Sequence, residues 1–289
     1  MKINSISPEK HKYLQGIVTI DVPPVTLFYI GTLPLERRPT LAVVGTRRPT
    51  RYGADVTETL VRELAQAGII IVSGLALGVD AIAHRTTLEA HGTTLAVLAN
   101  PLPRILPSTN RQLGERIVQQ GGAVISEHSD DEPTHYAVGK WSFLERNRIV
   151  AGISDAILIT EASARSGTLN TAMHALRQGK DVFVVPGNIT SPSSAGCNAL
   201  IRQGATPVTC AQDILDVLVP DYQAAQQQLP LGNTPAETAI IDCLSRDIHD
   251  ADEIQRLTDI DPVELSTALS MLEITGVIKP LGANHWSLR

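Results

Sequence analysis

Aromatic residues and cysteines are both scarce in this chain. It has two tryptophans, five tyrosines and three phenylalanines among 289 residues. Its three cysteines, Cys197, Cys210 and Cys243, form no C-x-x-C pair, so neither a disulfide framework nor a zinc site is expected. No uninterrupted run of about 18 apolar residues occurs, and the N-terminus lacks the apolar core of a secretion signal. These absences argue against a membrane or secreted protein and lead us to expect a cytoplasmic one.

An overall excess of positive charge is also missing, since the formal net charge is −6. The negative charge lies at one end of the chain. Residues 234–289 carry ten acidic and four basic side chains, whereas residues 1–233 carry twenty of each. A binding site for an anionic partner must therefore be a local cluster of cations on the larger, neutral part.

Short apolar runs alternate with helical patterns between residues 40 and 218. "TLAVVG" (40–45) is typical of a buried parallel strand, and residues 53–68 place apolar side chains at helical spacing before Gly68. Further strands are expected at 69–74, 93–99, 123–127, 155–160, 181–187 and 206–209. This alternation predicts an α/β fold with a doubly wound parallel sheet, which binds ligands at the carboxyl ends of its strands.

The chain after this region changes character. Residues 219–235 are rich in Gln and Pro and are interpreted as a linker. Three helical patterns and a hairpin pattern follow in 236–289, the order of a small winged helix-turn-helix domain.

The third of these helical patterns lacks the cations of a DNA-reading helix. Between residues 257 and 278 there is no Lys or Arg, whereas Asp259, Asp261, Glu264 and Glu273 are present. A recognition helix needs cations that face the groove. We therefore expect this domain to contact protein, with its own core formed by Leu265, Leu269 and Leu272.

Three strand-to-helix junctions carry residues suited to an anion. They comprise Gly45 and Arg47, then Ser73, Gly74 and Gly78, and lastly Ser166, Gly167 and Thr168. Glycine lets a phosphate approach the backbone, arginine offers a planar fork of donors, and a helix N-terminus presents free N–H groups. Simpler explanations remain open, because the glycines can serve close packing and a threonine can cap its helix.

Other polar residues near these junctions have ordinary interpretations. Arg48 and Arg51 are expected to be solvated charges, and Asp80 with His84, one helical turn apart, to be a structural pair. Arg47 is different, because it follows the carboxyl end of the first sheet strand, where ligands bind.

The stretch "KWSFLERNRIV" (140–150) sets two of the few aromatics among cations. Such a cluster suits single-stranded nucleic acid, because cations follow the backbone and a ring offers a face to any base. Lys140 would take a phosphate, and Phe143 or Trp141 would stack on a base. If the stretch is extended, we expect only one of Arg146 and Arg148 to reach the ligand. The alternative places both rings in the core and makes "ERNR" a surface ion-pair network.

Common catalytic and cofactor motifs are absent. There is no G-x-G-x-x-G after the first strand, no P-loop, no G-x-S-x-G and no H-E-x-x-H. The second strand ends in Ser73-Gly74, where a nicotinamide site would place an acid. We therefore expect no catalytic set, no metal and no cofactor.

Several segments together resemble the DNA-processing protein family called DprA or Smf. They are "GTR", "IVSGLALGVDAIAH", "TLAVLAN" with "PSTN", "ISE", "FLERNRIVAGISDAILITEA", "SGTLNTA" and "GKDVFVVPGNITSPSSAGCNALIRQGA", in order between about residues 20 and 218. The resemblance implies an extended Rossmann-like fold, a homodimer, and binding of single-stranded DNA without strong sequence preference. It also implies loading of the recombinase RecA on incoming DNA in natural transformation, by displacing or working around single-strand-binding protein. By motif, Arg47 in "GTR" and Lys140 with Phe143 in "KWSF" match the family's DNA-contacting positions.

The sequence departs from the family pattern in three places. The family's "GSR" reads "GTR" here, and "ANPLPRILPSTN" replaces a stretch that usually carries glycines, which changes one expected rim of the pocket. The 39 residues before the expected sheet are too few for the N-terminal sterile-alpha-motif domain common in the family, so they are interpreted as an extension.

Two other functions fit the same superfamily. Phosphoribohydrolases with a similar fold carry P-G-G-x-G-T-x-x-E, whose glutamate is catalytic. Here "ARSGTLNTA" keeps Gly167 and Thr168 but has Thr171 where the glutamate would stand, so the carboxylate for that chemistry is missing. A module that senses a nucleotide in the same pocket is the third candidate.

Overall fold

The computed structural model describes residues 2–130, 136–220, 232, 234–246, 248–282 and 284–288. The chain divides into two compact units, Met1–Tyr222 and Gln223–Arg289. The division falls inside the expected linker, most of which, 221–231 and 233, lies outside the described residues. No helix of the described part is long and apolar enough to cross a membrane.

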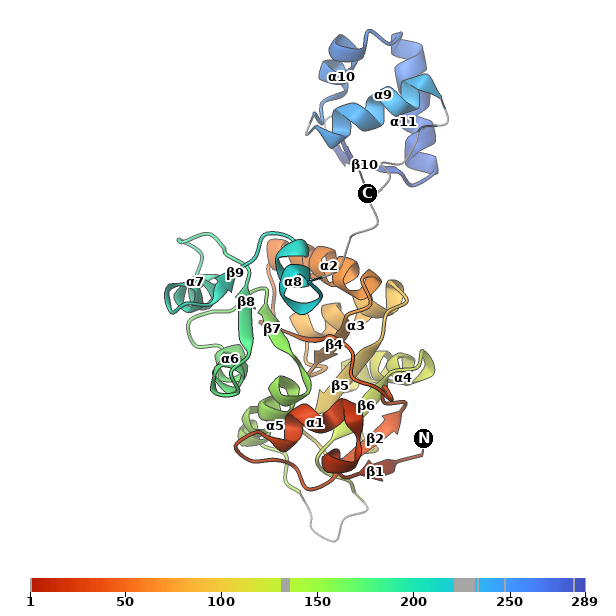
Figure 1. The fold of residues 1–289 in the computed structure, drawn as a ribbon. Coiled ribbons are helices and arrows are strands. Elements are labelled where there is room, and N and C mark those ends of the chain that lie inside the picture. The colour runs from red at the N-terminus through yellow and green to blue at the C-terminus, as the bar shows by residue number, and fades with distance from the viewer. Residues whose placement is uncertain are drawn as a thin grey trace. The chain divides into compact units, whose positions relative to one another are not determined.

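The first unit is built on a nine-stranded sheet in the order β1-β2-β6-β5-β4-β3-β7-β8-β9 (Figure 1). Its strands are β1 (Asn4–Ile6), β2 (Leu27–Gly31), β3 (Thr40–Val44), β4 (Ile70–Ser73), β5 (Thr94–Leu98), β6 (Ala123–Ser126), β7 (Ala156–Ile159), β8 (Asp181–Val184) and β9 (Thr206–Pro207). Strands β3 to β9 are parallel to their neighbours, whereas β2 pairs antiparallel with β6 and β1 antiparallel with β2. The predicted doubly wound α/β fold is confirmed, with an antiparallel edge that the apolar pattern did not indicate.

Helices cover both faces of this sheet (Figure 1). On one face lie α1 (Gln15–Val18), α5 (Lys140–Ile153), α6 (Thr168–Arg177) and α7 (Ala195–Arg202), and on the other α2 (Arg51–Gln66), α3 (Val79–Glu89), α4 (Arg111–Gln119) and α8 (Gln212–Leu218). Three short 3-10 helices, η1 (Pro8–Lys10), η2 (Lys12–Leu14) and η3 (Ser108–Asn110), complete the unit. In β3, Ala42 and Val44 face one core, and Leu41 and Val43 face the other. Burial on both faces explains why the central strands are continuous apolar runs.

The first 39 residues are part of this unit. Tyr13, Leu14 and Ile17 are fully buried, and the Tyr13 hydroxyl lies 2.9 Å from the Thr40 hydroxyl. Burial raises the pKa of Tyr13 above its ordinary value. The segment therefore closes one end of the core and contributes two strands to the sheet.

Residues 140–153 form a helix, α5, and not the extended piece that we considered. Its start is fixed by Ser142, whose Oγ accepts a hydrogen bond from the Gly139 N–H at 3.1 Å. The other end is held by Lys180, whose Nζ donates to the carbonyl oxygens of Ala151, Gly152 and Ser154 at 2.6–2.9 Å. A cation at a helix C-terminus satisfies free carbonyls and complements the helix dipole.

The second unit is a winged helix-turn-helix domain, as predicted. It consists of α9 (Pro235–Ser245), α10 (Ala251–Thr258), α11 (Pro262–Ile274) and the hairpin of β10 (Ile278–Gly282) and β11 (His285–Leu288). Leu265, Leu269 and Leu272 are buried in its core, which confirms their expected place.

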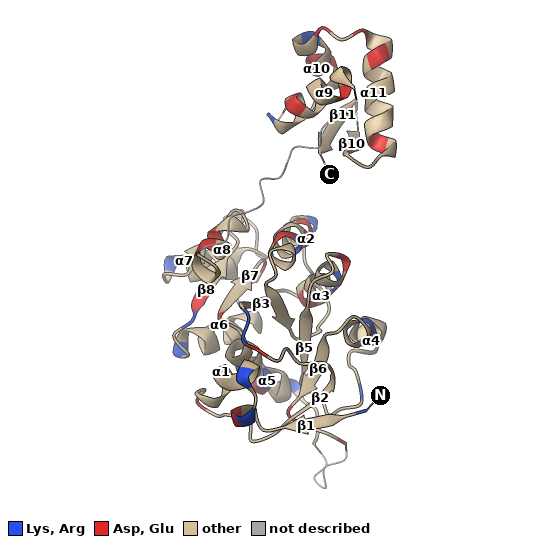
Figure 2. Ribbon diagram, turned by 45° about the vertical axis from the view of Figure 1, so that its right-hand side comes forward, with Lys and Arg blue, Asp and Glu red and all other residues tan. Residues whose placement is uncertain are grey.

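Acidic residues occur on all three helices of this unit, where the ribbon is red (Figure 2). Two of the acids have structural roles, because Asp250 and Asp261 accept backbone N–H groups at the starts of α10 and α11. Asp259 lies between these helices with φ 55°, in the left-handed region that Asp tolerates.

Candidate functional site

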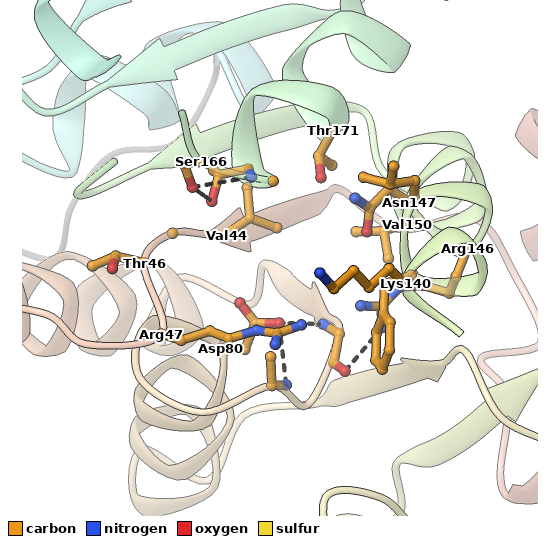
Figure 3. A pocket seen from close by; sticks show the side chains of 17 residues that line it. Val44, Thr46, Arg47, Asp80, Lys140, Arg146, Asn147, Val150, Ser166 and Thr171 are labelled. Carbon is orange, nitrogen blue, oxygen red and sulfur yellow. Dashed lines mark hydrogen bonds between the residues drawn. The ribbon is translucent and has the colours of Figure 1, made fainter. Parts of the chain in front are cut away.

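A pocket of about 340 Å³ lies at the carboxyl ends of β3 and β4 and beside the start of α6. It is lined by Val44, Gly45, Thr46, Arg47, Gly74, Ala76, Asp80, Lys140, Phe143, Leu144, Arg146, Asn147, Val150, Ser166, Gly167, Thr168 and Thr171 (Figure 3). Strand β3 is followed in space by β4, β5 and β6 on one side and by β7, β8 and β9 on the other. The pocket therefore occupies the point where the strand order reverses, which is where doubly wound sheets bind ligands.

Helix α5 supplies one wall of the pocket. Lys140, Phe143, Asn147 and Val150 line it, at spacings of three, four and three residues. These spacings place the four side chains on one helical face. Trp141, on a different face, is 75% exposed and does not line the pocket, so the structure selects Phe143 from the two candidate rings.

Arg47 reaches across the pocket to this wall. Its guanidinium carbon lies 5.2 Å from the centroid of the Phe143 ring, within the range of a cation–π interaction. Phe143 remains 38% exposed. Figure 3 shows Arg47 and Lys140 extending into the opening from opposite sides. Two exposed cations and a partly exposed ring, predicted from separate segments, are thus brought together.

The loop that carries Arg47 is held at both ends by one buried residue, Glu161. The Thr46 N–H donates to the Glu161 carbonyl oxygen at 2.8 Å, and the Thr50 N–H donates to Glu161 Oε2 at 2.8 Å. Glu161 is 3% exposed. Its carboxylate fits because residue 53 is glycine; an added Cβ there would lie 2.1 Å from Oε2. This residue escaped the sequence analysis, because an acid after a strand has no local pattern that shows which loop it meets.

Gly78 supports the same loop from the other side. Its φ is +76°, and an added Cβ would lie 2.7 Å from the Arg47 carbonyl oxygen. Only glycine tolerates both conditions without strain. Gly78 is therefore a packing partner of the Arg47 loop and does not itself line the pocket.

The floor of the pocket contains a compensated pair of buried charges. Arg146 is 8% exposed, and its Nη1 donates to the carbonyl oxygen of Gly74 at 2.9 Å and to that of Val97. Asp80 accepts the N–H groups of Gly74 and Ala76 at 3.1 and 3.3 Å. Burial lowers the pKa of Arg146 to about 10, which nearby Asp80 opposes, and burial raises the pKa of Asp80, which Arg146 opposes. Arg146 thus fixes the β4–α3 junction while lending positive charge from below.

His84 takes no part in this floor. Its Nδ1 lies 2.6 Å from the Thr94 hydroxyl, and burial lowers its pKa to about 3. Asp80 and His84 therefore each have structural partners of their own, in line with a structural interpretation of both.

The third junction forms the remaining wall. Ser166 Oγ accepts the Thr168 N–H at 3.2 Å and donates to the Thr168 hydroxyl at 2.9 Å. An added Cβ at Gly167 would meet nothing within 4 Å, so packing does not explain this glycine. Thr171 lines the wall where a phosphoribohydrolase would place its glutamate. Among the described lining residues, Asp80 alone carries a carboxylate, and its Oδ2 accepts two backbone N–H groups.

Besides Gly78, two of the predicted site residues do not line the pocket. Arg148 is 6% exposed; its Nη2 donates to both carboxylate oxygens of Glu127, at 2.7 and 2.9 Å, and its Nε donates to the Val22 carbonyl oxygen. Ser73 is fully buried and donates to the Val43 carbonyl oxygen at 2.6 Å. No group of three His, Cys, Asp or Glu side chains in the described ranges could hold a metal ion.

The structure adds Thr46 and Asn147 to the residues that the sequence suggested. Asn147 lies one helical turn after Phe143, and its Nδ2 donates to Asn170 Oδ1 at 3.2 Å. A helical interpretation of residues 140–150 would have revealed it, because positions four apart share a face.

Comparison with known proteins assigns both units to families. Residues 4–219 match the family described as DNA recombination-mediator protein A, and residues 223–284 match the DprA winged helix domain.

Two curated relatives illustrate the similarity. The chain is 37% identical over 217 residues to "DNA processing protein DprA" of Bacillus subtilis (strain 168), covering 75% of this chain and 71% of that protein. It is 41% identical over 204 residues to "Protein Smf" of Escherichia coli (strain K12), covering 71% of this chain and 53% of that protein. The chain thus spans about half of the second relative and somewhat over two thirds of the first.

Two solved structures resemble the first unit. DNA processing protein A from Streptococcus pneumoniae superposes with a TM-score of 0.69 at 38% identity, covering 75% of each chain. DNA processing protein A from Helicobacter pylori superposes with a TM-score of 0.66 at 33% identity, covering 77% of this chain and 98% of that one. The structure of the Helicobacter protein is described as giving insight into how that protein binds single-stranded DNA.

Proposed function

This chain belongs to the DNA recombination-mediator protein A family, and from that premise we propose that it binds single-stranded DNA in the pocket at the end of β3. The observation that carries the proposal is the meeting of Arg47, Lys140 and the partly exposed ring of Phe143 in one opening. The two cations bind phosphates, and the ring stacks on a base. The structure of the Helicobacter relative, described by its single-stranded DNA binding mode, supports the choice of ligand.

The geometry favours a single strand over a duplex. The bases of a duplex are already stacked on one another, so their faces are not available to Phe143. A volume of about 340 Å³ lies at the small end of ligand pockets, which span about 300–1,000 Å³. Such a pocket accepts an unstacked nucleotide, while the phosphates on either side remain near the rim.

Among the residues suggested by the sequence, we assign different roles. Arg47 and Lys140 are the phosphate partners, and Phe143 is the stacking platform. Arg146 shapes the floor, and residues 166–168, which lead into α6, shape the wall. Arg148 is left out of the interface, because its guanidinium is committed to Glu127.

We extend the proposal to a biological role that the family name supports. A recombination mediator delivers single-stranded DNA to a recombinase, so RecA is the expected recipient and single-strand-binding protein the expected competitor on incoming DNA in natural transformation. The protein would act in the cytoplasm, without a cofactor, as a homodimer. Sedimentation equilibrium tests whether the protein is a homodimer. RecA filament assembly on coated oligonucleotides tests whether it delivers DNA to RecA.

For the winged helix we propose a protein partner. Along α11, Val263, Met271 and Ile274 are 74%, 46% and 79% exposed, and spacings of eight and three residues place them on one face. Helix α11 contains no Lys or Arg, whereas the recognition helix of a DNA-reading domain would carry them. An exposed apolar stripe beside acidic residues suits a basic, amphipathic segment of another protein.

The residues of the same pocket bear on the two alternatives, a phosphoribohydrolase and a nucleotide-sensing module. Thr171 in place of a catalytic glutamate weighs against phosphoribohydrolase chemistry, while a small pocket with cations is compatible with nucleotide sensing. A thermal-shift screen of nucleoside monophosphates against short oligonucleotides separates both alternatives from DNA binding, because a ligand that binds the native state raises its melting temperature.

The central test compares oligo-dT with duplex of equal length by fluorescence anisotropy across salt concentrations. We expect tighter binding of oligo-dT and a fall in affinity as salt rises. Equal affinity for the two forms at moderate salt would refute the stacking argument.

A further inference from the structure

A second cavity, of about 610 Å³, is lined in part by residues that directly follow the Arg47 loop in the chain. Thr50 and Tyr52 line it from the start of α2, and residues 186–194, between β8 and α7, supply the opposite wall. No acidic residue is among its described lining side chains, which are hydroxyls, an amide and one aromatic ring beside glycine and proline. Neutral donors and acceptors next to a ring suit a nucleobase better than they suit a cation.

The two cavities lie along one path at the carboxyl edge of the sheet. Arg47 lines the first cavity, and Thr50, three positions further along the chain, lines the second. Three residues of fully extended chain span at most about 11 Å. A stacked strand advances about 3.4 Å per nucleotide, so roughly three nucleotides or fewer span the distance between these two lining residues.

Tyr52 presents its ring to the second cavity in a fixed orientation. Its hydroxyl donates to the Pro186 carbonyl oxygen at 3.0 Å, which ties the ring to the opposite wall. The residue is nevertheless 52% exposed. A ring that is already held in place loses little conformational entropy when a base stacks on it. Since the hydroxyl has a partner, the free face of the ring is the part available to a ligand.

Cations flank this ring on the same segment. Arg48 is exposed, and the Arg51 side chain is 96% exposed, with its carboxylate neighbour Asp55 at the long distance of 3.7 Å. Such an exposed ion pair contributes little to stability. The Arg51 guanidinium is therefore available to a phosphate. The second cavity thus has a ring in its lining and exposed cations on the adjoining residues of the chain, whereas in the first the cations themselves line the cavity.

We propose that Tyr52 forms a second base-stacking subsite, so that one DNA strand runs from Phe143 across the Arg47 loop to Tyr52. The inference rests on the proposed function, because it extends the same strand beyond the first pocket. It assigns a DNA-binding role to Tyr52 and the second cavity, which neither the sequence patterns nor the first pocket included.

Anisotropy titrations of the full chain with a length series of oligo-dT test the subsite. Oligonucleotides too short to reach the second cavity should bind Tyr52→Ala as tightly as wild type. Longer ones should bind Tyr52→Ala about fivefold or more weakly, the lower end of the loss for a stacked base. Tyr52→Phe keeps the ring and should retain most of the affinity for long oligonucleotides.

Trp141→Ala is the matched control, since Trp141 is an exposed aromatic that lines neither cavity. It should bind every length as wild type does. A loss in Tyr52→Ala that is equal at all lengths would show that Tyr52 acts through the Arg47 loop and would overturn the subsite. Unchanged binding of long oligonucleotides by a folded Tyr52→Ala would also overturn it while leaving the proposed function intact. Absence of oligo-dT binding by wild type would overturn both.

Discussion

Replacing Glu161 should weaken DNA binding although this residue lies outside the pocket. Its carbonyl oxygen accepts the Thr46 N–H and its carboxylate accepts the Thr50 N–H, so it closes the loop that presents Arg47. Glu161→Ala removes the second of these bonds and leaves the first. The loop then remains anchored at Thr46 and is free at Thr50.

The expected losses of stability and of DNA affinity follow from the missing hydrogen bond and from the less ordered Arg47 loop. A hydrogen bond to a charged group contributes about 1.5–3 kcal/mol to stability, so the free energy of unfolding should fall by about 2 kcal/mol. Immobilising a long side chain on binding costs about 0.5–1.5 kcal/mol. If Arg47 must be ordered anew by the ligand, the dissociation constant should rise by about two- to twelvefold.

Glu161→Gln provides the matched variant. Its amide oxygen can still accept the Thr50 N–H, so the loop stays closed while the negative charge is lost. We expect DNA affinity close to that of wild type. Denaturant unfolding measures stability, and anisotropy with labelled oligo-dT measures affinity for both variants.

A double-mutant cycle with Arg47→Ala distinguishes positioning from general damage. If Glu161 acts by holding Arg47, then Glu161→Ala should have almost no further effect on affinity in the Arg47→Ala background. Additive losses of affinity would refute this reasoning, because they would mean that Glu161 and Arg47 act independently.

Three further predictions concern charge, domain organisation and pH. Arg47→Ala and Lys140→Ala should each reduce the slope of log affinity against log salt by about 0.7, as expected for one phosphate contact, whereas Phe143→Ala should lower affinity by about 1–3 kcal/mol with the slope unchanged. Deleting residues 223–289 should leave oligo-dT affinity unchanged or slightly higher, because the removed unit is acidic. Because burial lowers the pKa of His84 from 6.5 to about 3, the unfolded state binds a proton that the folded state excludes, so stability should fall as pH drops from 6.5 toward 3, and His84→Gln should flatten this part of the profile.

Each of these predictions has its own control. A large drop in the melting temperature of Phe143→Ala with DNA affinity intact would make the ring a core residue. Circular dichroism must show that the truncated protein is folded, and a tenfold loss of affinity in a folded truncation would mean that the winged helix binds DNA. For the pH profile, chemical denaturation of wild type and His84→Gln at matched pH values gives the comparison, and identical slopes would contradict the assignment.

Local patterns in the sequence predicted most strands of the sheet. Strands β3 to β8 are apolar runs because both of their faces are buried, and that requirement acts on each strand separately. Strand β2, which lies second from the edge between β1 and β6, escaped detection, because its partly buried side chains do not form such a run. The helices between strands were predicted for a similar reason, since one apolar face repeats along each of them.

The candidate residues were also predicted, but their arrangement was not. Arg47 and Lys140 are 93 positions apart in the printed sequence, and only the reversal of strand order between β3 and β7 brings their segments to one opening. The aromatic rings at 141 and 143 are two residues apart in an alternating pattern, which favours an extended interpretation. Packing of α5 on the sheet, with Lys180 at its end, makes this segment helical instead.

The two arginines of "RNR" show where local information ends. Residues two apart on a helix point about 200° away from each other, so Arg146 lies under the pocket while Arg148 turns to Glu127. The sequence by itself determined that this region carries cations and rings, because composition is a local property. Only the tertiary structure decided which cation faces the pocket, which is buried beneath it and which residue holds the Arg47 loop, because those roles depend on contacts between segments distant in the chain.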